Sequence, residues 1–106
     1  MVTGSSGYVA NYIMKTFAKA NPSIQVVGMS RSGKAREAET ESLPNVSYVS
    51  GNCLEPETFK KTLEDVDSIV HTVGTLLPSS LPQKSYKEMN FDAAVNMARE
   101  LNALGD

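Results

Sequence analysis

The sequence has few of the residues that build metal sites or covalent cross-links. Its 106 residues include one cysteine, one histidine and no tryptophan. A single cysteine, Cys53, excludes an internal disulfide and is typical of a reducing compartment. Because a Cys/His zinc site takes four ligands, one residue of each type cannot build one. We therefore expect an intracellular protein without a metal site.

Neither charge nor hydropathy points to a nucleic acid or a membrane as the partner. The net charge is −2 and no basic patch stands out, so a nucleic-acid partner is not expected. No apolar run approaches the ~20 residues that cross a bilayer, and no secretory signal opens the chain. With 41% hydrophobic and 21% charged residues, the composition is typical of one globular domain at most.

Short apolar, β-branched runs alternate with helical patterns along the chain. This alternation is typical of βαβ units and predicts an α/β fold with a three-layer, Rossmann-type parallel sheet. We expect about four strands in the order 3-2-1-4. Residues 31–44 lack an apolar stripe, which predicts a surface loop with one helical turn at most. The expected strands are residues 1–3, 24–30, 46–50 and 68–73, and the expected helices are residues 8–20, 56–63 and 86–104.

A glycine pattern, Gly4-x-x-Gly7-x-x-Ala10, lies between the first expected strand and the first expected helix. Gly4 permits a tight turn, Gly7 allows close approach of a pyrophosphate, and Ala10 lets the helix press against the sheet. The free N–H groups of the first helical turn then face the phosphates. The alternative is a turn that is merely rich in glycine. The predicted phosphate cradle of a dinucleotide consists of Gly4, Ser5, Ser6, Gly7, Tyr8 and Val9, with hydroxyl donors from both serines.

Five motifs lie along the chain: Thr3-Gly4-x-x-Gly7-x-x-Ala10, Ser30-Arg31-Ser32-Gly33, Gly51-Asn52-Cys53-Leu54, residues 67–74 and Tyr86-x-x-x-Asn90. Together they resemble the extended and atypical short-chain dehydrogenases. The resemblance covers nearly the whole chain and implies a partial NAD(P)-binding Rossmann domain over residues 1–106. It adds further cofactor contacts at Ser30, Arg31, Ser32, Asn52, Cys53, Leu54, Thr72, Val73, Gly74 and Asn90, although Asn52 stands where the family usually has an aspartate.

The stretches VVGMSRSGK, VHTVGTLL and SYKEMNFDAA are most similar to one atypical subgroup. That subgroup includes mitochondrial proteins of ubiquinone biosynthesis and a nucleotide-binding accessory subunit of respiratory complex I. The resemblance implies a mitochondrial location.

The end of the second expected strand bears on the choice of cofactor. NAD-binding domains usually carry an acidic residue there, which binds the ribose 2′-hydroxyl. This chain has Arg31 instead, flanked by Ser30 and Ser32, and a guanidinium can pair with a 2′-phosphate. We therefore predict NADP over NAD, assisted by Lys34. There are two alternatives for Arg31: it is a solvated cation of the loop, or it stacks on the adenine and does not discriminate between NADP and NAD.

The resemblance also identifies what the chain does not contain. Catalytic members of the family use a Tyr-x-x-x-Lys pair beyond the fifth strand, and no such pair occurs here. We expect a domain truncated before strand five and clipped at strand one, whose strand-four edge is covered by the rest of the domain or by another protein. Its parent is then an NADP-dependent oxidoreductase or epimerase-like enzyme, a non-catalytic nucleotide-binding module of a mitochondrial quinone or respiratory complex, or a fragment that binds nothing. Cys53 and His71 are interpreted as core residues.

Overall fold

The computed structural model describes residues 1–72 and 92–105, in two compact units. The first unit comprises residues 1–51 and 67–72, and the second comprises residues 52–66 with the described part of the C-terminal segment. Over the described residues, no helix combines the length and apolar character that a bilayer span requires.

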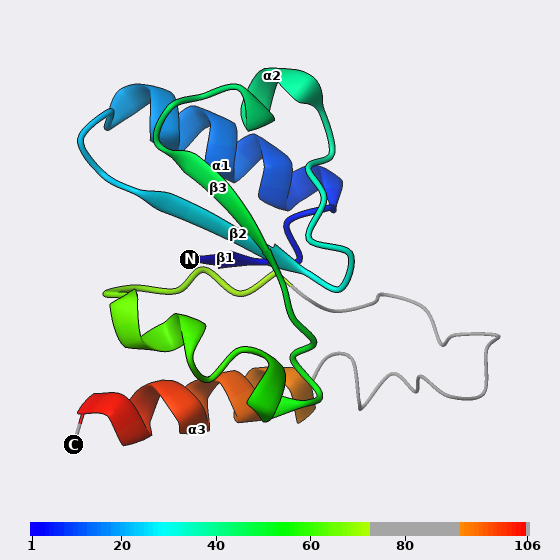
Figure 1. Cartoon of the computed structure of the whole chain (residues 1–106), viewed down its shortest axis with the longest axis vertical. Helices are drawn as coiled ribbons and strands as arrows, with labels where there is room; N and C mark the ends of the chain where they lie inside the picture. Colours follow the sequence, from blue (N-terminus) through cyan, green and yellow to red (C-terminus); the bar gives the residue numbers. More distant parts are fainter. Residues whose placement is uncertain (73–91, 106) are drawn as a thin grey trace, which may run out of the picture. The chain divides into compact units, whose positions relative to one another are not determined.

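The first unit is built on a parallel sheet of three strands, β1 (Val2–Thr3), β2 (Val26–Ser30) and β3 (Val46–Ser50). The middle strand is β2, which pairs with β1 on one side and β3 on the other (Figure 1). The parallel α/β fold is therefore confirmed, and β3 has its predicted bounds. Because strand β2 begins two residues later than predicted, residues 24 and 25 belong to the preceding turn.

Helix α1 (Tyr8–Ala20) packs against this sheet and has the predicted bounds. Its buried apolar side chains recur every four residues, at Ala10, Met14 and Ala18, and they form one core with Val2 and Val26. This spacing places them on one face of the helix. The close approach of α1 is visible at Gly28 of β2. A Cβ atom built there would lie 2.7 Å from the Met14 Cε atom and 2.7 Å from the Ser5 Cβ atom.

A buried asparagine joins the amino ends of the strands to the end of α1. Asn45, which precedes β3, donates from its side-chain amide to the carbonyls of Ala18, Asn21 and Ile24 at 3.1, 3.2 and 2.9 Å. Its own carbonyl accepts the Val26 N–H at 2.8 Å. The last carbonyls of a helix have no partner within the helix, so the bond to the Ala18 carbonyl satisfies a buried group near the end of α1.

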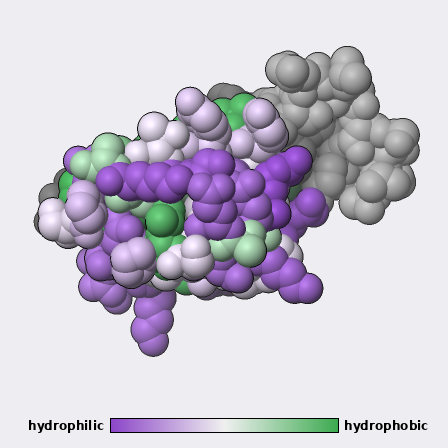
Figure 2. All heavy atoms as spheres, turned by 90° about the horizontal axis from the view of Figure 1, so that it is seen from above, coloured by the Kyte–Doolittle hydropathy of each residue, from purple (hydrophilic) through white to green (hydrophobic). Residues whose placement is uncertain are grey.

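The segment after β2 contains one short helix, α2 (Ala38–Glu41), in agreement with the predicted single turn. In Figure 1 it lies beside α1, and the face that carries both helices is largely hydrophilic (Figure 2).

The predicted fourth strand is an isolated bridge in the described residues. Val70 pairs in parallel with Val2, its N–H bonding to the Met1 carbonyl and its carbonyl accepting the Thr3 N–H, both at 2.9 Å. The next ladder bond is replaced, because the Thr72 N–H donates to the Thr3 side-chain hydroxyl at 3.0 Å. Pairing with a two-residue strand therefore stops after one residue. The bridge lies at the edge of β1 away from β2, the side predicted for strand four.

The predicted helix over residues 56–63 is wrong. The second unit has two short 3₁₀ helices instead, η1 (Pro56–Thr58) and η2 (Thr62–Asp65). The Thr58 hydroxyl is bound to the segment before η1: it lies 3.1 and 2.7 Å from the carbonyls of Asn52 and Glu55, which share its proton, and it accepts the Asn52 N–H at 2.8 Å. Such local side-chain bonds compete with the regular helical ladder.

Helix α3 (Ala93–Gly105) packs against both 3₁₀ helices within the second unit (Figure 1). The amide of Asn96 donates to the Cys53 carbonyl at 3.0 Å, which links α3 to the start of the unit. Met97 is buried on this helix. The first part of the predicted helix, residues 86–91, lies outside the described residues.

Candidate functional site

The glycine turn joins β1 to α1 at the carboxyl end of the sheet. Gly4 has a φ of 68°, in the left-handed region that favours glycine. The turn closes with a bond from the Gly7 N–H to the Gly4 carbonyl at 2.9 Å. A Cβ atom on Gly7 would lie 3.2 Å from that carbonyl oxygen, so a side chain there would press on the turn. Both glycines therefore fit the predicted geometry.

Gly7 is also the N-cap of α1, and no side chain caps this end of the helix. The first N–H groups of an α-helix have no partner inside it, so they need a side chain, water or ligand. The side chains of Tyr8 and Val9 are 74% and 63% exposed, which leaves the first turn accessible. The arrangement fits an anion such as a pyrophosphate, which the exposed N–H groups and the helix dipole would favour.

The structure corrects the prediction for Ser5, which is buried instead of facing the phosphates. Its N–H bonds to the Met29 carbonyl at 3.0 Å, and its side chain is fully buried beside Gly28. The hydroxyl oxygen has no hydrogen-bond partner. Because both donors point away from solvent, Ser5 cannot add the predicted hydroxyl contact in this conformation. Ser6 is exposed and keeps that possibility.

The end of β2 presents a cation beside serines that already have partners. The Ser30 hydroxyl accepts the Gly33 N–H at 3.0 Å, and the Ser32 hydroxyl accepts the Lys34 N–H at 3.2 Å. Arg31 is exposed, and none of the ion pairs among the described residues includes it. Its guanidinium is therefore free to meet an anion, whereas the two serines chiefly shape the loop.

Arg36 is the residue of this region that the sequence analysis missed. Its Nη1 atom donates to the Ser6 carbonyl at 3.1 Å, and its Cζ atom lies 5.6 Å from the centre of the Tyr8 ring. This places a guanidinium on the glycine turn itself. The available signal was the cluster of three cations, Arg31, Lys34 and Arg36, within six residues.

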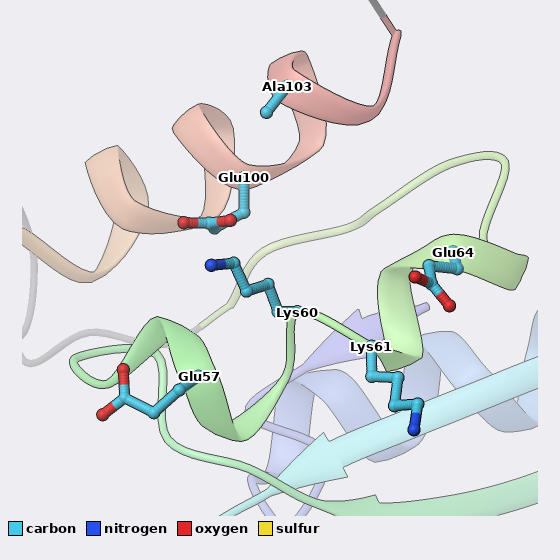
Figure 3. A pocket seen from close by; sticks show the side chains of 6 residues that line it. All are labelled: Glu57, Lys60, Lys61, Glu64, Glu100 and Ala103. Atoms are coloured by element: carbon cyan, nitrogen blue, oxygen red, sulfur yellow. The ribbon is translucent and has the colours of Figure 1, made fainter.

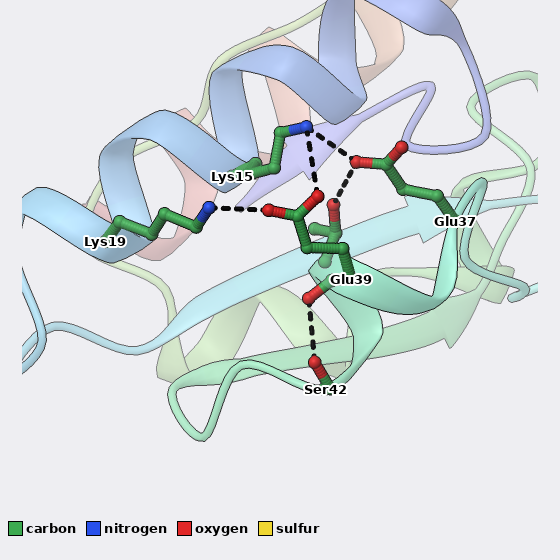
Figure 4. A network of polar contacts seen from close by, with 6 residues as sticks. Lys15, Lys19, Glu37, Glu39 and Ser42 are labelled. Atoms are coloured by element: carbon green, nitrogen blue, oxygen red, sulfur yellow. Dashed lines mark hydrogen bonds and ion pairs between the residues drawn. The ribbon is translucent and has the colours of Figure 1, made fainter.

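Two lysines of α1 hold the carboxylates that follow this cluster in the sequence (Figure 4). Lys15 lies 2.8 Å from a Glu37 oxygen and 3.7 Å from a Glu39 oxygen, and Lys19 lies 2.7 Å from Glu39. The hydrogen bond from Lys15 lowers the pKa of Glu37 to about 2, and the bond from Lys19 lowers the pKa of Glu39. These carboxylates are therefore bound to α1 as anions.

Thr72 and His71 lie beside β1 in the first unit. The Thr72 hydroxyl donates to the Thr3 carbonyl at 2.6 Å. His71 Nδ1 is 2.8 Å from the Thr3 hydroxyl, while its buried Nε2 has no hydrogen-bond partner. Burial lowers the pKa of His71, which favours the neutral ring. These contacts agree with its interpretation as a packed residue. Of the other predicted contacts here, Val73, Gly74 and Asn90 lie outside the described residues.

The residues of the second unit that were predicted to contact the cofactor are Asn52, Cys53 and Leu54, and they interact with neighbouring residues or are buried. The Asn52 side-chain oxygen accepts the Leu54 N–H at 2.9 Å, and its amide donates to Glu55 at 3.4 Å. Cys53 is buried, and burial raises the pKa of its thiol to about 11. Such a thiol stays protonated near neutral pH and packs as a small apolar residue. Asn52 and Cys53 therefore stabilise the second unit.

A surface hollow of about 460 Å³ lies within the second unit (Figure 3). Its lining combines both signs of charge and includes none of the predicted cofactor residues. Among the described residues, no group of three or more histidine, cysteine or acidic side chains is arranged to hold a metal ion. The residues that line the hollow are Glu57, Lys60, Lys61, Glu64, Glu100 and Ala103.

A family model described as "NAD dependent epimerase/dehydratase family" matches residues 1–105. The chain belongs to this family. Membership agrees with the predicted dinucleotide binding and with the resemblance to extended short-chain dehydrogenases. A comparison with curated proteins found no match.

Two solved structures share the fold. The Bordetella bronchiseptica enzyme WbmH, in complex with NAD⁺, is 18% identical with a TM-score of 0.73, covering 98% of this chain and 34% of WbmH. A double mutant of DesIV, the dTDP-glucose 4,6-dehydratase of Streptomyces venezuelae with NAD and DAU bound, is 19% identical with a TM-score of 0.71, covering 98% of this chain and 35% of DesIV. The chain thus spans about a third of the length of either protein.

Proposed function

We propose that the chain binds NADP through the glycine turn and the segment that follows β2. The observation that carries the proposal is the uncapped, exposed beginning of α1 at Gly7. Free N–H groups at such a position bind phosphate without any charged side chain. Membership of a family described as NAD-dependent supports a nicotinamide dinucleotide as the ligand.

The preference for NADP rests on charge at the end of β2. A carboxylate in that place would bind the ribose 2′-hydroxyl and repel a 2′-phosphate, but Arg31 occupies it. Because its guanidinium has no carboxylate partner among the described residues, pairing with a phosphate breaks no existing ion pair. WbmH and DesIV were both determined with NAD, so the proposal separates this chain from those two proteins.

The activity that fits best is that of an oxidoreductase or epimerase-like enzyme. A bound nicotinamide supplies hydride transfer, and this chain's residues hold and orient the dinucleotide. Support comes from membership of the epimerase/dehydratase family. Because the chain spans about a third of WbmH and DesIV, we propose that substrate binding and proton transfer depend on residues outside it.

Titration with NADPH and NADH tests the proposal. The purified protein is expected to bind NADPH more tightly, as measured by nicotinamide fluorescence and by the rise of its melting temperature. Arg31→Asp should weaken NADPH by roughly tenfold or more, because a charge-assisted contact is replaced by repulsion, and should leave NADH nearly unchanged. The control is Lys61→Asp, the same charge change on an exposed residue of the second unit. Binding of neither cofactor would overturn the proposal.

A second candidate is a non-catalytic nucleotide-binding module of a mitochondrial quinone or respiratory complex. Its support is the similarity of VVGMSRSGK, VHTVGTLL and SYKEMNFDAA to the atypical subgroup. In that case a bound dinucleotide stabilises an assembly without turnover. Fractionation of cells and co-purification with respiratory partners would favour it, and turnover of the dinucleotide by the purified protein would exclude it.

A further inference from the structure

We infer that Arg36 is a second specificity-determining residue, which contacts the 2′-phosphate of the dinucleotide from the glycine turn. The inference rests on the proposed function and deepens it. Arg31 was predicted from its place at the end of β2, whereas Arg36 emerges from its contacts alone. Its guanidinium bonds the Ser6 carbonyl at 3.1 Å, so it is already fixed at the turn where the phosphates would lie.

The geometry leaves most of the guanidinium available. An arginine side chain has five N–H donors, and the structure uses one of them on Ser6. The Tyr8 ring, 5.6 Å from Arg36 Cζ, is within the range of a cation–π contact. These two contacts restrict an otherwise flexible side chain. A cation that is already oriented loses less conformational entropy when it binds an anion.

Arg36 belongs to the segment that follows β2, which in Rossmann folds lies beside the adenosine ribose. It therefore connects the two parts of the predicted site, the ribose segment and the glycine turn. A guanidinium in this position favours the phosphate on the ribose over a hydroxyl, because its planar fork of donors matches phosphate oxygens.

The distribution of charge around Arg36 supports an anionic ligand. Arg31, Lys34 and Arg36 form a cluster without an acidic residue, and none of the ion pairs among the described residues includes them. The acidic residues that follow, Glu37 and Glu39, are held by Lys15 and Lys19 of α1. The carboxylates that could neutralise the cluster are thus already paired elsewhere.

The test compares Arg36→Gln with Lys61→Gln, which removes the same charge from an exposed residue of the second unit. Direct titration with NADPH and NADH gives the primary readout. Calorimetry with adenosine 2′,5′-bisphosphate and with adenosine 5′-monophosphate isolates the 2′-phosphate. Arg36→Gln should weaken NADPH and the bisphosphate by about tenfold, with NADH and the monophosphate changed less than about threefold. Lys61→Gln should leave all four affinities nearly unchanged.

Arg36→Lys separates charge from shape. It keeps the cation but loses the planar fork, and we expect intermediate NADPH affinity. The melting temperature of each unliganded variant reports any structural role of the contacts with Ser6 and Tyr8.

The outcomes distinguish the two proposals. If the wild-type protein binds neither cofactor, both the proposed function and this inference are overturned. If it binds NADPH but Arg36→Gln binds NADPH equally well, only the inference is overturned. Equal weakening of NADPH and NADH would also overturn it, since the lost contact would then not be with the 2′-phosphate.

Discussion

The two ends of the first unit are built on opposite principles. At the amino ends of the strands, Asn45 binds carbonyls from α1 and from the segment that connects α1 to β2. At the carboxyl ends, α1 begins without a side-chain cap, and the turn before it uses a glycine with positive φ. One end is closed by internal hydrogen bonds, and the other keeps donors and cations exposed. The difference indicates that stability and ligand binding can be altered separately in this unit.

The largest expected effect is at Gly28 of β2, where the sheet packs closely against the glycine turn and α1. Gly28→Ala puts a methyl group 2.7 Å from Ser5 Cβ, in the glycine turn, and from the flexible tip of Met14. Met14 can move, but the turn must shift as well. We expect a loss of about 2–3 kcal/mol of stability, measured by urea unfolding, together with weaker dinucleotide binding. The control Ser47→Ala, on the exposed face of β3, should change neither. Full stability of Gly28→Ala would contradict the close packing.

A smaller effect, confined to stability, is expected at the amino ends. Asn45→Ala removes the donors to three carbonyls. One of them, that of Ala18, belongs to α1, and another, that of Ile24, belongs to the segment between α1 and β2. The expected loss is about 1–3 kcal/mol in urea unfolding, because buried acceptors are left unsatisfied. The binding constant for NADPH, measured on the folded variant, should not change. Asn102→Ala, on an exposed position of α3, is the control. A large change in affinity would show that the two ends are not independent.

The smallest effect is a pH dependence from Glu37. Its folded-state pKa is about 2, below the ordinary value of 4.5, because Lys15 bonds its carboxylate. A lowered pKa means that the folded state favours the charged form. The contribution to stability is therefore full above pH 4.5 and is lost as the pH falls towards 2. Glu37→Gln should reduce the fall in melting temperature over this range, whereas the exposed Glu64→Gln should not. Identical pH profiles for Glu37→Gln and the wild type would contradict this role.

The sequence predicts best what depends on a regular pattern. Helix α1 and strand β3 have their predicted bounds, because the apolar residues of α1 recur at helical spacing and β3 is a β-branched run with turns on both sides. The glycine turn was also predictable, since its residues are local and only glycine adopts the φ of Gly4 easily. Local rules of this kind need no knowledge of the rest of the fold.

What the sequence could not predict depends on side chains that meet through folding. Composition favoured one helix over residues 56–63, but the structure has two 3₁₀ helices, and the Thr58 hydroxyl binds the carbonyls of Asn52 and Glu55 before the first of them. The burial of Ser5 follows from the space beside Gly28 on another element. Arg36 reaches Ser6 across 30 residues, a contact set by the course of the loop after β2. Each of these outcomes is decided by a specific contact that residue type alone does not reveal.

The glycine at the N-cap of α1 has a consequence for how the helix ends respond to a ligand. A serine or aspartate in place of Gly7 would hold the first N–H groups by itself. With glycine there, an anion that binds the turn acts as the cap. The stability of the first helical turn therefore increases with occupancy of the site. The protection of the Tyr8 and Val9 amides against hydrogen exchange would then rise with ligand concentration, as required of any ligand that binds only the folded state.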